Sequence, residues 1–156
     1  MFFILLYGLM IVLATLHLAF TKKTRTLYYV SEIFLLYFLL GIGLSSLNTY
    51  VLHVFYASVV SNLSTNLFQY QLGMAYLGIG VLGVLCLFFR GKFWLATIIM
   101  NTVFNWGIAA RYLSLMLKTH QYKLSGVGLL FDLYILVPLI TIILYVIMRR
   151  QKPSIL

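Results

Sequence analysis

The feature that most constrains this sequence is a succession of long apolar runs separated by short basic loops. The runs cover about residues 2–21, 30–54, 67–89, 93–117 and 127–148. A helix needs about 20 apolar residues to cross the hydrocarbon core of a bilayer, and each run is about that long. The sequence therefore predicts an all-α, polytopic transmembrane helical bundle of about five spans, with residues 1–156 forming a single transmembrane domain.

The composition also favours lipid over water as the solvent of this chain. Hydrophobic residues make up 63% of the sequence and charged residues 8%, whereas about 25% of the residues in soluble domains are charged. A soluble fold of 156 residues could not bury so much apolar surface. We therefore attribute the net charge of +9 to basic membrane loops. We expect no nucleic-acid partner, but a secondary attraction to anionic lipid headgroups.

The distribution of basic residues predicts the orientation of the bundle. With five crossings, one side holds Lys22, Lys23 and Arg25, then Arg90 and Lys92, and finally Arg149, Arg150 and Lys152. The loops of the other side carry Lys118 and Lys123. Because short basic loops stay in the cytoplasm, we expect the N-terminus outside and the C-terminus inside. The first run has no basic residues before it, so we interpret it as an uncleaved anchor.

Glycines inside the third run predict helix packing. Residues 78–83 spell G-x-G-x-x-G, but no strand precedes them and no helix begins after them, so nucleotide binding is not expected. Gly73, Gly80 and Gly83 fall on one helical face, where small residues let helices approach closely in lipid. On the second run, the same role is expected for Gly41 and Ser45.

No catalytic or metal-binding constellation is apparent in the sequence. Cys86 is the single cysteine, so no internal disulfide can form. His17 and His53 are expected in opposite leaflets, which prevents them from sharing a metal or a haem. We expect no cofactor and no catalytic residue. Glu32 is expected to begin its helix near basic residues, and Pro138, in the middle of the last run, predicts a kink.

Polar side chains within the apolar runs are the best pointers to function, because they are costly to place in a bilayer. They concentrate in the predicted outer half. Two interpretations remain open: hydrogen bonds that hold helices together, worth about 1 kcal/mol each, or a ligand or ion site. The residues of this polar cluster are Asn48, Thr49, His53, Gln71, Asn101, Asn105 and Tyr112.

Several stretches occur in a shared order over most of the chain from about residue 30. They are EIFLL at 32–36, HVF at 53–55, FQYQLG at 68–73, GVLG at 80–83, FRGKFWLAT at 89–97 and ILVP at 135–138. In this order they resemble an uncharacterised family of small bacterial inner-membrane proteins, a domain of unknown function near the DoxX-like proteins. The resemblance implies a multi-pass protein of the bacterial inner (plasma) membrane with no known activity.

The same resemblance includes departures at ionisable positions. Gln71 stands where the family usually has Glu, Tyr112 where it has His, and Tyr134 where it has Asp, and the loop 56–66 is shortened. If the family's ionisable residues bind an ion or do chemistry, the resemblance implies that this member has lost that property.

Three functional hypotheses follow, in order of preference. The first is a non-enzymatic integral membrane protein that binds a lipid, a membrane protein partner or a second copy of itself. The second is a small transporter or channel subunit that uses a polar cavity in the outer leaflet. The third is a membrane enzyme, which the sequence supports least.

An ion pair between Arg111 and Asp132 is the sharpest structural prediction from sequence. Arg111 lies roughly 9 Å and Asp132 roughly 8 Å to the outer side of the middle of their runs, at about 1.5 Å per residue, and a guanidinium suits a desolvated carboxylate. Arg111→Ala and Asp132→Ala should each lower the free energy of unfolding in detergent, and the double variant should lose less than the sum. Simple additivity of the two losses would mean that no pair exists.

Overall fold

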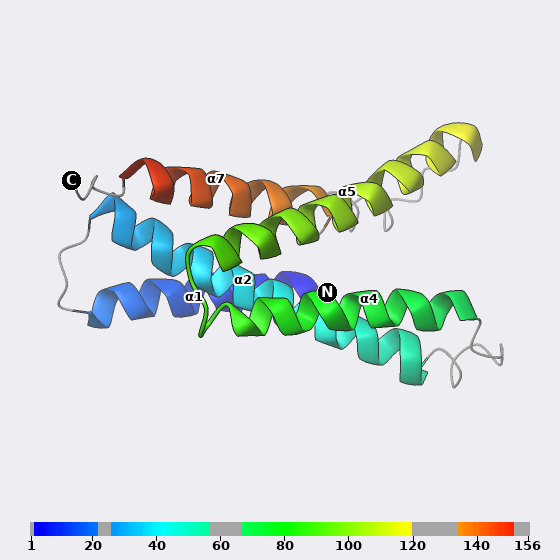
Figure 1. Cartoon of the computed structure of the whole chain (residues 1–156), viewed down its shortest axis with the longest axis horizontal. Helices are drawn as coiled ribbons and strands as arrows, with labels where there is room; N and C mark the ends of the chain where they lie inside the picture. The colour runs from blue at the N-terminus through cyan, green and yellow to red at the C-terminus, as the bar shows by residue number, and fades with distance from the viewer. Residues whose placement is uncertain (1, 22–25, 57–66, 120–133, 152–156) are drawn as a thin grey trace.

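The computed structural model describes residues 2–21, 26–56, 67–119 and 134–151, and within these ranges every regular element is a helix. The all-helical prediction is thereby confirmed (Figure 1). The elements are α1 (Phe2–Phe20), α2 (Leu27–Val51), the π-helical η1 (Leu52–Tyr56), α4 (Leu67–Leu85), α5 (Lys92–Thr119) and α7 (Val137–Gln151).

The helix bounds differ from the predicted runs where local hydrogen bonding decides. The second run was expected to begin at 30, but α2 begins at Leu27 because the Thr26 hydroxyl caps it, accepting from the backbone N–H of Tyr29 at 3.3 Å. The third run was expected to reach 89, but α4 ends at Leu85. The chain then reverses toward α5 through Gly91, whose φ of 72° lies in the left-handed region that suits glycine.

The helices share one clearly defined end. We call it the turn end, because it carries the connection between α4 and α5 at residues 86–91. The end of α1, the start of α2 and the end of α7 also lie there, whereas α5 diverges from α4 away from the turn (Figure 1). Helix α2 is central: it contacts α1, α4, α5 and α7.

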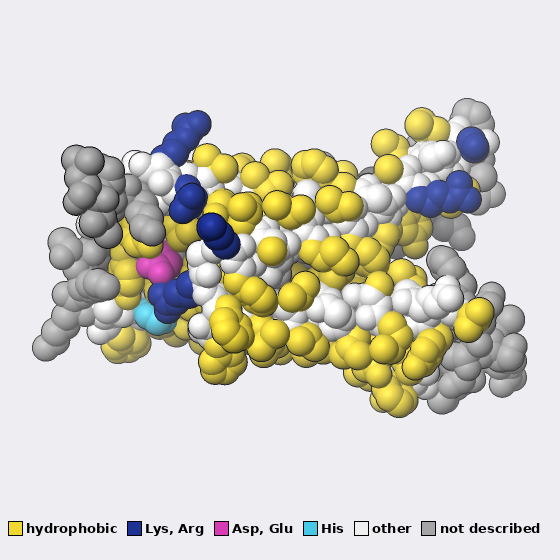
Figure 2. Space-filling model, in the orientation of Figure 1, with side chains coloured by type: hydrophobic (Ala, Val, Ile, Leu, Met, Phe, Trp, Pro, Cys, Tyr) yellow, Lys and Arg dark blue, Asp and Glu magenta, His cyan; other side chains and the backbone are white. Residues whose placement is uncertain are grey.

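The apolar side chains are distributed as in a helical bundle whose outer surface is in contact with an apolar environment. A buried core forms around α2, where Leu35, Leu39 and Ile42 pack with Ile79 and Ile98. Large apolar side chains also cover the outside of the helices, so a broad hydrophobic band crosses the molecule (Figure 2). On a soluble protein such a surface would be an aggregation hazard.

Among the described residues, four helices are long and apolar enough to cross a membrane: Phe2–Phe20, Leu27–Tyr56, Lys92–Lys118 and Tyr134–Gln151. These four helices suggest a membrane protein. The apolar stretch of α4, Gln69–Leu85, is shorter. Lysine and arginine side chains gather toward the two ends of the molecule, on either side of the apolar band (Figure 2).

The contact between α2 and α4 is close enough to require glycine. A Cβ added at Gly83 would lie 2.5 Å from the backbone N and Cα of Gly43. At Gly80 it would lie 2.7 Å from Leu47 Cγ, and at Gly73 2.7 Å from a Val54 methyl group. The face that carries Gly73, Gly80 and Gly83 therefore lies against α2 and η1.

On α2, the glycine opposite α4 is not one of the residues singled out from sequence. Gly43 is the partner of Gly83, whereas a Cβ added at Gly41 would lie 3.0 Å from the Tyr7 ring of α1. Ser45 also faces α1, with its Oγ 3.4 Å from the Tyr7 hydroxyl. Gly41 and Ser45 thus serve the contact with α1. Gly43 escaped notice because periodicity alone does not say which neighbour a face will meet.

Pro138, expected in the middle of the last run as the site of a kink, lies where the helical winding of the described segment changes. It is the second residue of α7, which follows a π-helical turn at residues 134–136; residues 127–133 of the predicted run lie outside the described residues. Helical residues precede Pro138, so its ring replaces a backbone N–H that an unbroken helix would use. The expected kink stays a prediction, because the first part of the run lies outside the described residues.

Replacing Gly83 by alanine should separate α2 from α4. We expect the free energy of unfolding to fall by about 1–3 kcal/mol, the usual effect of overpacking, because the new methyl group meets the Gly43 backbone. Gly78→Ala is the matched control: a Cβ there meets nothing within 4 Å, and alanine is favoured over glycine in a helix by up to about 1 kcal/mol. Thermal unfolding in detergent measures both, and equal effects would contradict the assigned contact.

Candidate functional site

A cavity of about 190 Å³ lies between the helices in the half of the bundle away from the turn end. Every described helix contributes to its wall, and the lining mixes hydroxyl, amide, imidazole and aromatic groups. The lining residues are Phe3, Tyr7, Ser45, Ser46, Thr49, Leu52, His53, Tyr76, Asn101, Asn105, Tyr134 and Val137. We call this space the polar cavity.

Helix α5 supplies two amides to the polar cavity. Asn101 and Asn105 are one turn apart, and Asn105 Nδ2 donates to Asn101 Oδ1 at 2.7 Å. Asn101 is 2% exposed, and its own Nδ2 has no hydrogen-bond partner in the part of the chain that the structure describes. A buried donor left unpaired costs about 1–3 kcal/mol. The cavity therefore presents an amide that needs an acceptor from a bound molecule or water.

Helix α2 supplies the opposite wall with hydroxyl groups. Ser45 Oγ donates to the Ile42 carbonyl at 3.0 Å, and Thr49 Oγ1 donates to the Ser45 carbonyl at 2.9 Å. Each hydroxyl has one hydrogen, so these two groups can offer a guest only their lone pairs. The polar cavity thus has a donor side on α5 and an acceptor side on α2.

Aromatic rings separate the polar cavity from a larger groove. The His53 ring stacks on Tyr76 with centroids 5.9 Å apart, and Tyr76 meets Phe104 edge-on at 5.0 Å. The side chains of Tyr76 and Tyr134 lie next to each other between the two spaces. Because His53, Tyr76 and Tyr134 line both spaces, they form the partition between them.

The groove beyond this partition lies between α4 and α5 and measures about 620 Å³. Most of its wall is apolar, including Leu72, Val103 and Phe104. Arg111 and Tyr112 add a cation and a hydroxyl, and the Tyr112 ring stacks on Tyr134 with centroids 6.2 Å apart. We call this space the apolar groove. Its shape follows from the divergence of α5 from α4 (Figure 1).

The structure brings together some members of the polar cluster and leaves others apart. Four members line the polar cavity: Thr49, His53, Asn101 and Asn105. Tyr112 lines the adjoining apolar groove. Two other members do not line either space. Asn48 is half-buried on the flank of the Ser45–Thr49 face, and Gln71 is exposed.

The predicted ion pair cannot be placed. Arg111 is exposed along the apolar groove, but Asp132 lies outside the described residues, so the pair stays a prediction. Glu32 does not begin its helix as expected, because α2 begins at Leu27 and has no acidic residue in its first turn. It does lie near a basic residue: Arg90 Nη1 donates to its Oε1 at 2.7 Å. His17 Nδ1 lies 3.2 Å from the Tyr37 hydroxyl.

Sequence reasoning missed the tyrosines of the site. Tyr7 and Tyr76 line the polar cavity. Within an apolar run, a tyrosine is not distinguished from the other large hydrophobic residues by the sequence pattern. One signal was available: a tyrosine hydroxyl placed within lipid needs a partner, and both residues lie well inside their runs. Within the described ranges, no three His, Cys, Asp or Glu side chains gather as a metal site would require.

These features define a class of protein: an all-helical bundle with a polar cavity between helices long and apolar enough to cross a membrane. The chain belongs to a family of unknown function, DUF6790, whose profile matches residues 1–154. No curated protein and no solved structure matches the chain.

Proposed function

We propose that this chain is a multi-pass integral membrane protein of the bacterial inner membrane that binds a lipid-like molecule between its helices and catalyses no reaction. Four helices of sufficient length support the membrane setting. A fifth crossing by α4 follows from connectivity, because α2 ends away from the turn end and α5 begins at it. The 19 residues of α4 rise about 28 Å at 1.5 Å per residue, close to the hydrocarbon thickness.

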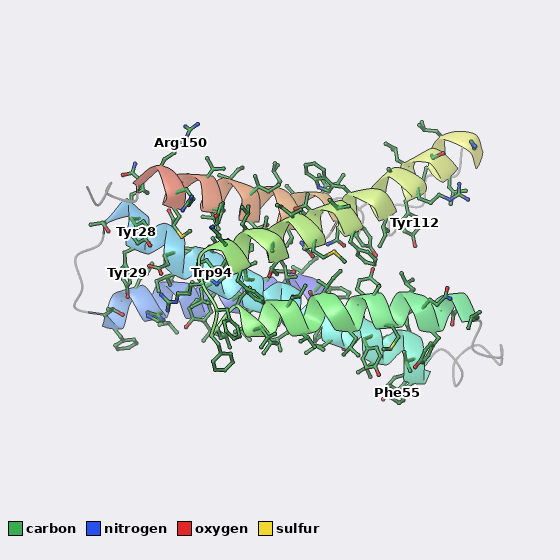
Figure 3. The ribbon with its side chains drawn as sticks, in the orientation of Figure 1. Tyr28, Tyr29, Phe55, Trp94, Tyr112 and Arg150 are labelled. Atoms are coloured by element: carbon green, nitrogen blue, oxygen red, sulfur yellow. The ribbon has the colours of Figure 1, made fainter. Side chains whose placement is uncertain are left out.

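The basic side chains support an orientation with the turn end in the cytoplasm. Arg90, Lys92, Arg149 and Arg150 belong to that end, against Arg111 and Lys118 in the second half of α5. Aromatic residues lie toward both ends of the bundle, with Tyr28 and Tyr29 toward the turn end and Phe55 and Tyr112 toward the other (Figure 3). Such rings are common at membrane interfaces.

Reporter fusions test this orientation. A fluorescent protein fused after Leu156 should fold and fluoresce, and alkaline phosphatase at the same position should be inactive, because positively charged loops keep that end in the cytoplasm. Alkaline phosphatase inserted in the loop 57–66 is the control and should be active. Activity at the C-terminal position would contradict five crossings with the N-terminus outside.

The unpaired amide of Asn101 is the observation that carries the proposal of a ligand. It is buried, it lines the polar cavity, and it offers N–H groups with no acceptor among the described residues. The adjoining apolar groove suits a hydrocarbon chain, and the polar cavity suits an acceptor such as an ester carbonyl. Ligand sites in proteins commonly combine such apolar walls with a few polar groups.

A transporter or channel is the alternative, and the turn-end half of the bundle argues against conduction by a single chain. There, Leu35, Leu39, Ile42, Ile79 and Ile98 are all at most 2% exposed and form one apolar core. The polar cavity does not continue through this layer. A conduction path would have to separate α2 from α4 and α5.

Native mass spectrometry of the protein extracted in mild detergent tests the ligand. We expect a retained molecule of lipid mass on the wild type and on Asn48→Leu, which changes a half-buried asparagine outside both spaces. Asn101→Leu should reduce the retained fraction several-fold, since a hydrogen bond contributes about 0.5–1.5 kcal/mol net. Equal retention by both variants would contradict the site, and a copurifying subunit with no small molecule would favour partner binding.

A further inference from the structure

A second pocket lies at the turn end, far from the polar cavity. It has a volume of about 310 Å³ and forms where the start of α2, the α4–α5 turn with the start of α5, and the end of α7 meet. Its lining residues are Tyr28, Glu32, Arg90, Gly91, Trp94, Tyr145, Met148 and Arg149. We call it the turn-end pocket. Nothing in the proposed function uses it.

The charges of the turn-end pocket do not balance. Arg90 and Arg149 come from different elements, and Glu32 is the acid that lines the pocket with them. Glu32 accepts from Arg90 Nη1 at 2.7 Å, with its side chain 15% exposed against 59% for Arg90. Arg149 is exposed and has no ion pair within the described ranges. One positive charge is therefore left over inside a concave site.

Arg90 is held in place by more than its ion pair. Its guanidinium carbon lies 5.9 Å from the centroid of the Trp94 ring, within the range of a cation–π contact. Trp94 is 1% exposed, and its indole N–H donates to the Cys86 carbonyl at 2.9 Å. A guanidinium has five N–H donors. The single bond to Glu32 leaves donors of this positioned group for a second anion.

The inner wall of the turn-end pocket is aromatic and apolar, through Tyr28, Trp94, Tyr145 and Met148. The site thus combines two guanidinium groups with an apolar floor, in the part of the bundle where Tyr28 and Trp94 lie (Figure 3). In the proposed membrane setting this end faces the lipid headgroups, and the fork of an arginine matches phosphate oxygens in pairs.

We propose that the turn-end pocket binds a phosphate group, that of an anionic membrane lipid, between the guanidinium groups of Arg90 and Arg149. Glu32 keeps Arg90 oriented and competes with the phosphate for it. The ester region of the lipid lies on Tyr145 and Met148. This site is independent of the polar cavity, since the two share no lining residue.

General attraction between a basic face and an anionic membrane is the competing explanation. It depends on the number of charges at the face and not on their place within it. Arg150 is a matched control, because it follows Arg149 directly, is likewise exposed, and projects outward from α7 (Figure 3). Lys92 is a second control: it is also exposed at the turn end and does not line the pocket.

Tryptophan quenching measures occupancy of this pocket directly. The chain has two tryptophans, so Trp106→Phe leaves Trp94, in the pocket wall, as the single reporter. This protein is reconstituted in phosphatidylcholine vesicles that contain increasing fractions of brominated phosphatidylglycerol, or of brominated phosphatidylcholine. We expect Trp94 to be quenched at a lower fraction of the anionic lipid than of the zwitterionic one.

The variants decide between a site and a charged face. In the Trp106→Phe background, Arg149→Gln and Arg90→Gln should each lower the preference for the anionic lipid by more than about tenfold, because hydrogen bonds to a charged group contribute about 1.5–3 kcal/mol. Arg150→Gln and Lys92→Gln should lower it by no more than the roughly fivefold that one surface charge contributes through general attraction. Glu32→Gln should raise it, because Arg90 is freed. Arg149→Lys keeps the charge but loses the planar guanidinium fork, so its preference for the anionic lipid should lie between those of the wild type and Arg149→Gln. An intermediate value also shows that the loss in Arg149→Gln is not caused by a folding defect.

Inorganic phosphate separates the two sources of the same chemistry. If millimolar phosphate displaces brominated phosphatidylglycerol, the pocket recognises phosphate as such and also admits the free ion; if it does not, the pocket requires the lipid. Both results support the phosphate site. An equal loss of preference in all four charge variants, or no preference for the anionic lipid at all, would overturn it. Neither of these two results would contradict the ligand proposed at Asn101, because the two sites share no lining residue.

Discussion

The approach of Gly43 to Gly83 is the contact on which the arrangement of the other helices depends. Within lipid, apolar surface gains little by leaving its solvent, so helices associate through close packing and hydrogen bonds. The 2.5 Å between an added Gly83 Cβ and the Gly43 backbone shows how close α2 and α4 come. Because α2 also contacts α1, α5 and α7, this pairing sets the framework on which the remaining helices rest.

The turn end and the opposite half differ because the short α4–α5 turn ties the helices at one end. There, Trp94 donates to the Cys86 carbonyl, and Cys86 Sγ donates to Thr97 Oγ1 at 3.4 Å. Arg90 joins the turn to α2 through Glu32. Away from the turn, α5 diverges from α4 (Figure 1), and the space between them forms the apolar groove beside the polar cavity.

Much of the fold could be predicted from sequence, because the lengths of the apolar runs and the positions of the basic loops do not depend on exact helix bounds or side-chain contacts. The site could be predicted less well. Thr49 and Asn101 were expected in one cluster and do line one cavity, whereas Gln71, expected with them, is exposed. The reason is the rotation of α4 about its axis, which is set by the close glycine contact with α2. The sequence of α4 alone does not reveal which of its polar side chains this rotation exposes.

Hydrogen-bond satisfaction distinguishes the polar residues that hold this bundle together from those that point to a ligand. Glu32 and the Trp94 indole lie at least partly buried, and each has a partner at 2.7–2.9 Å, so structure accounts for them. Asn101 is 2% exposed, yet its amide nitrogen has no partner among the described residues. The buried hydroxyl of Thr102 shares this property but does not line the polar cavity. An apolar residue at position 101 would avoid the cost of an unpaired amide, and the position of this amide in the cavity wall is why the proposed ligand site rests on it.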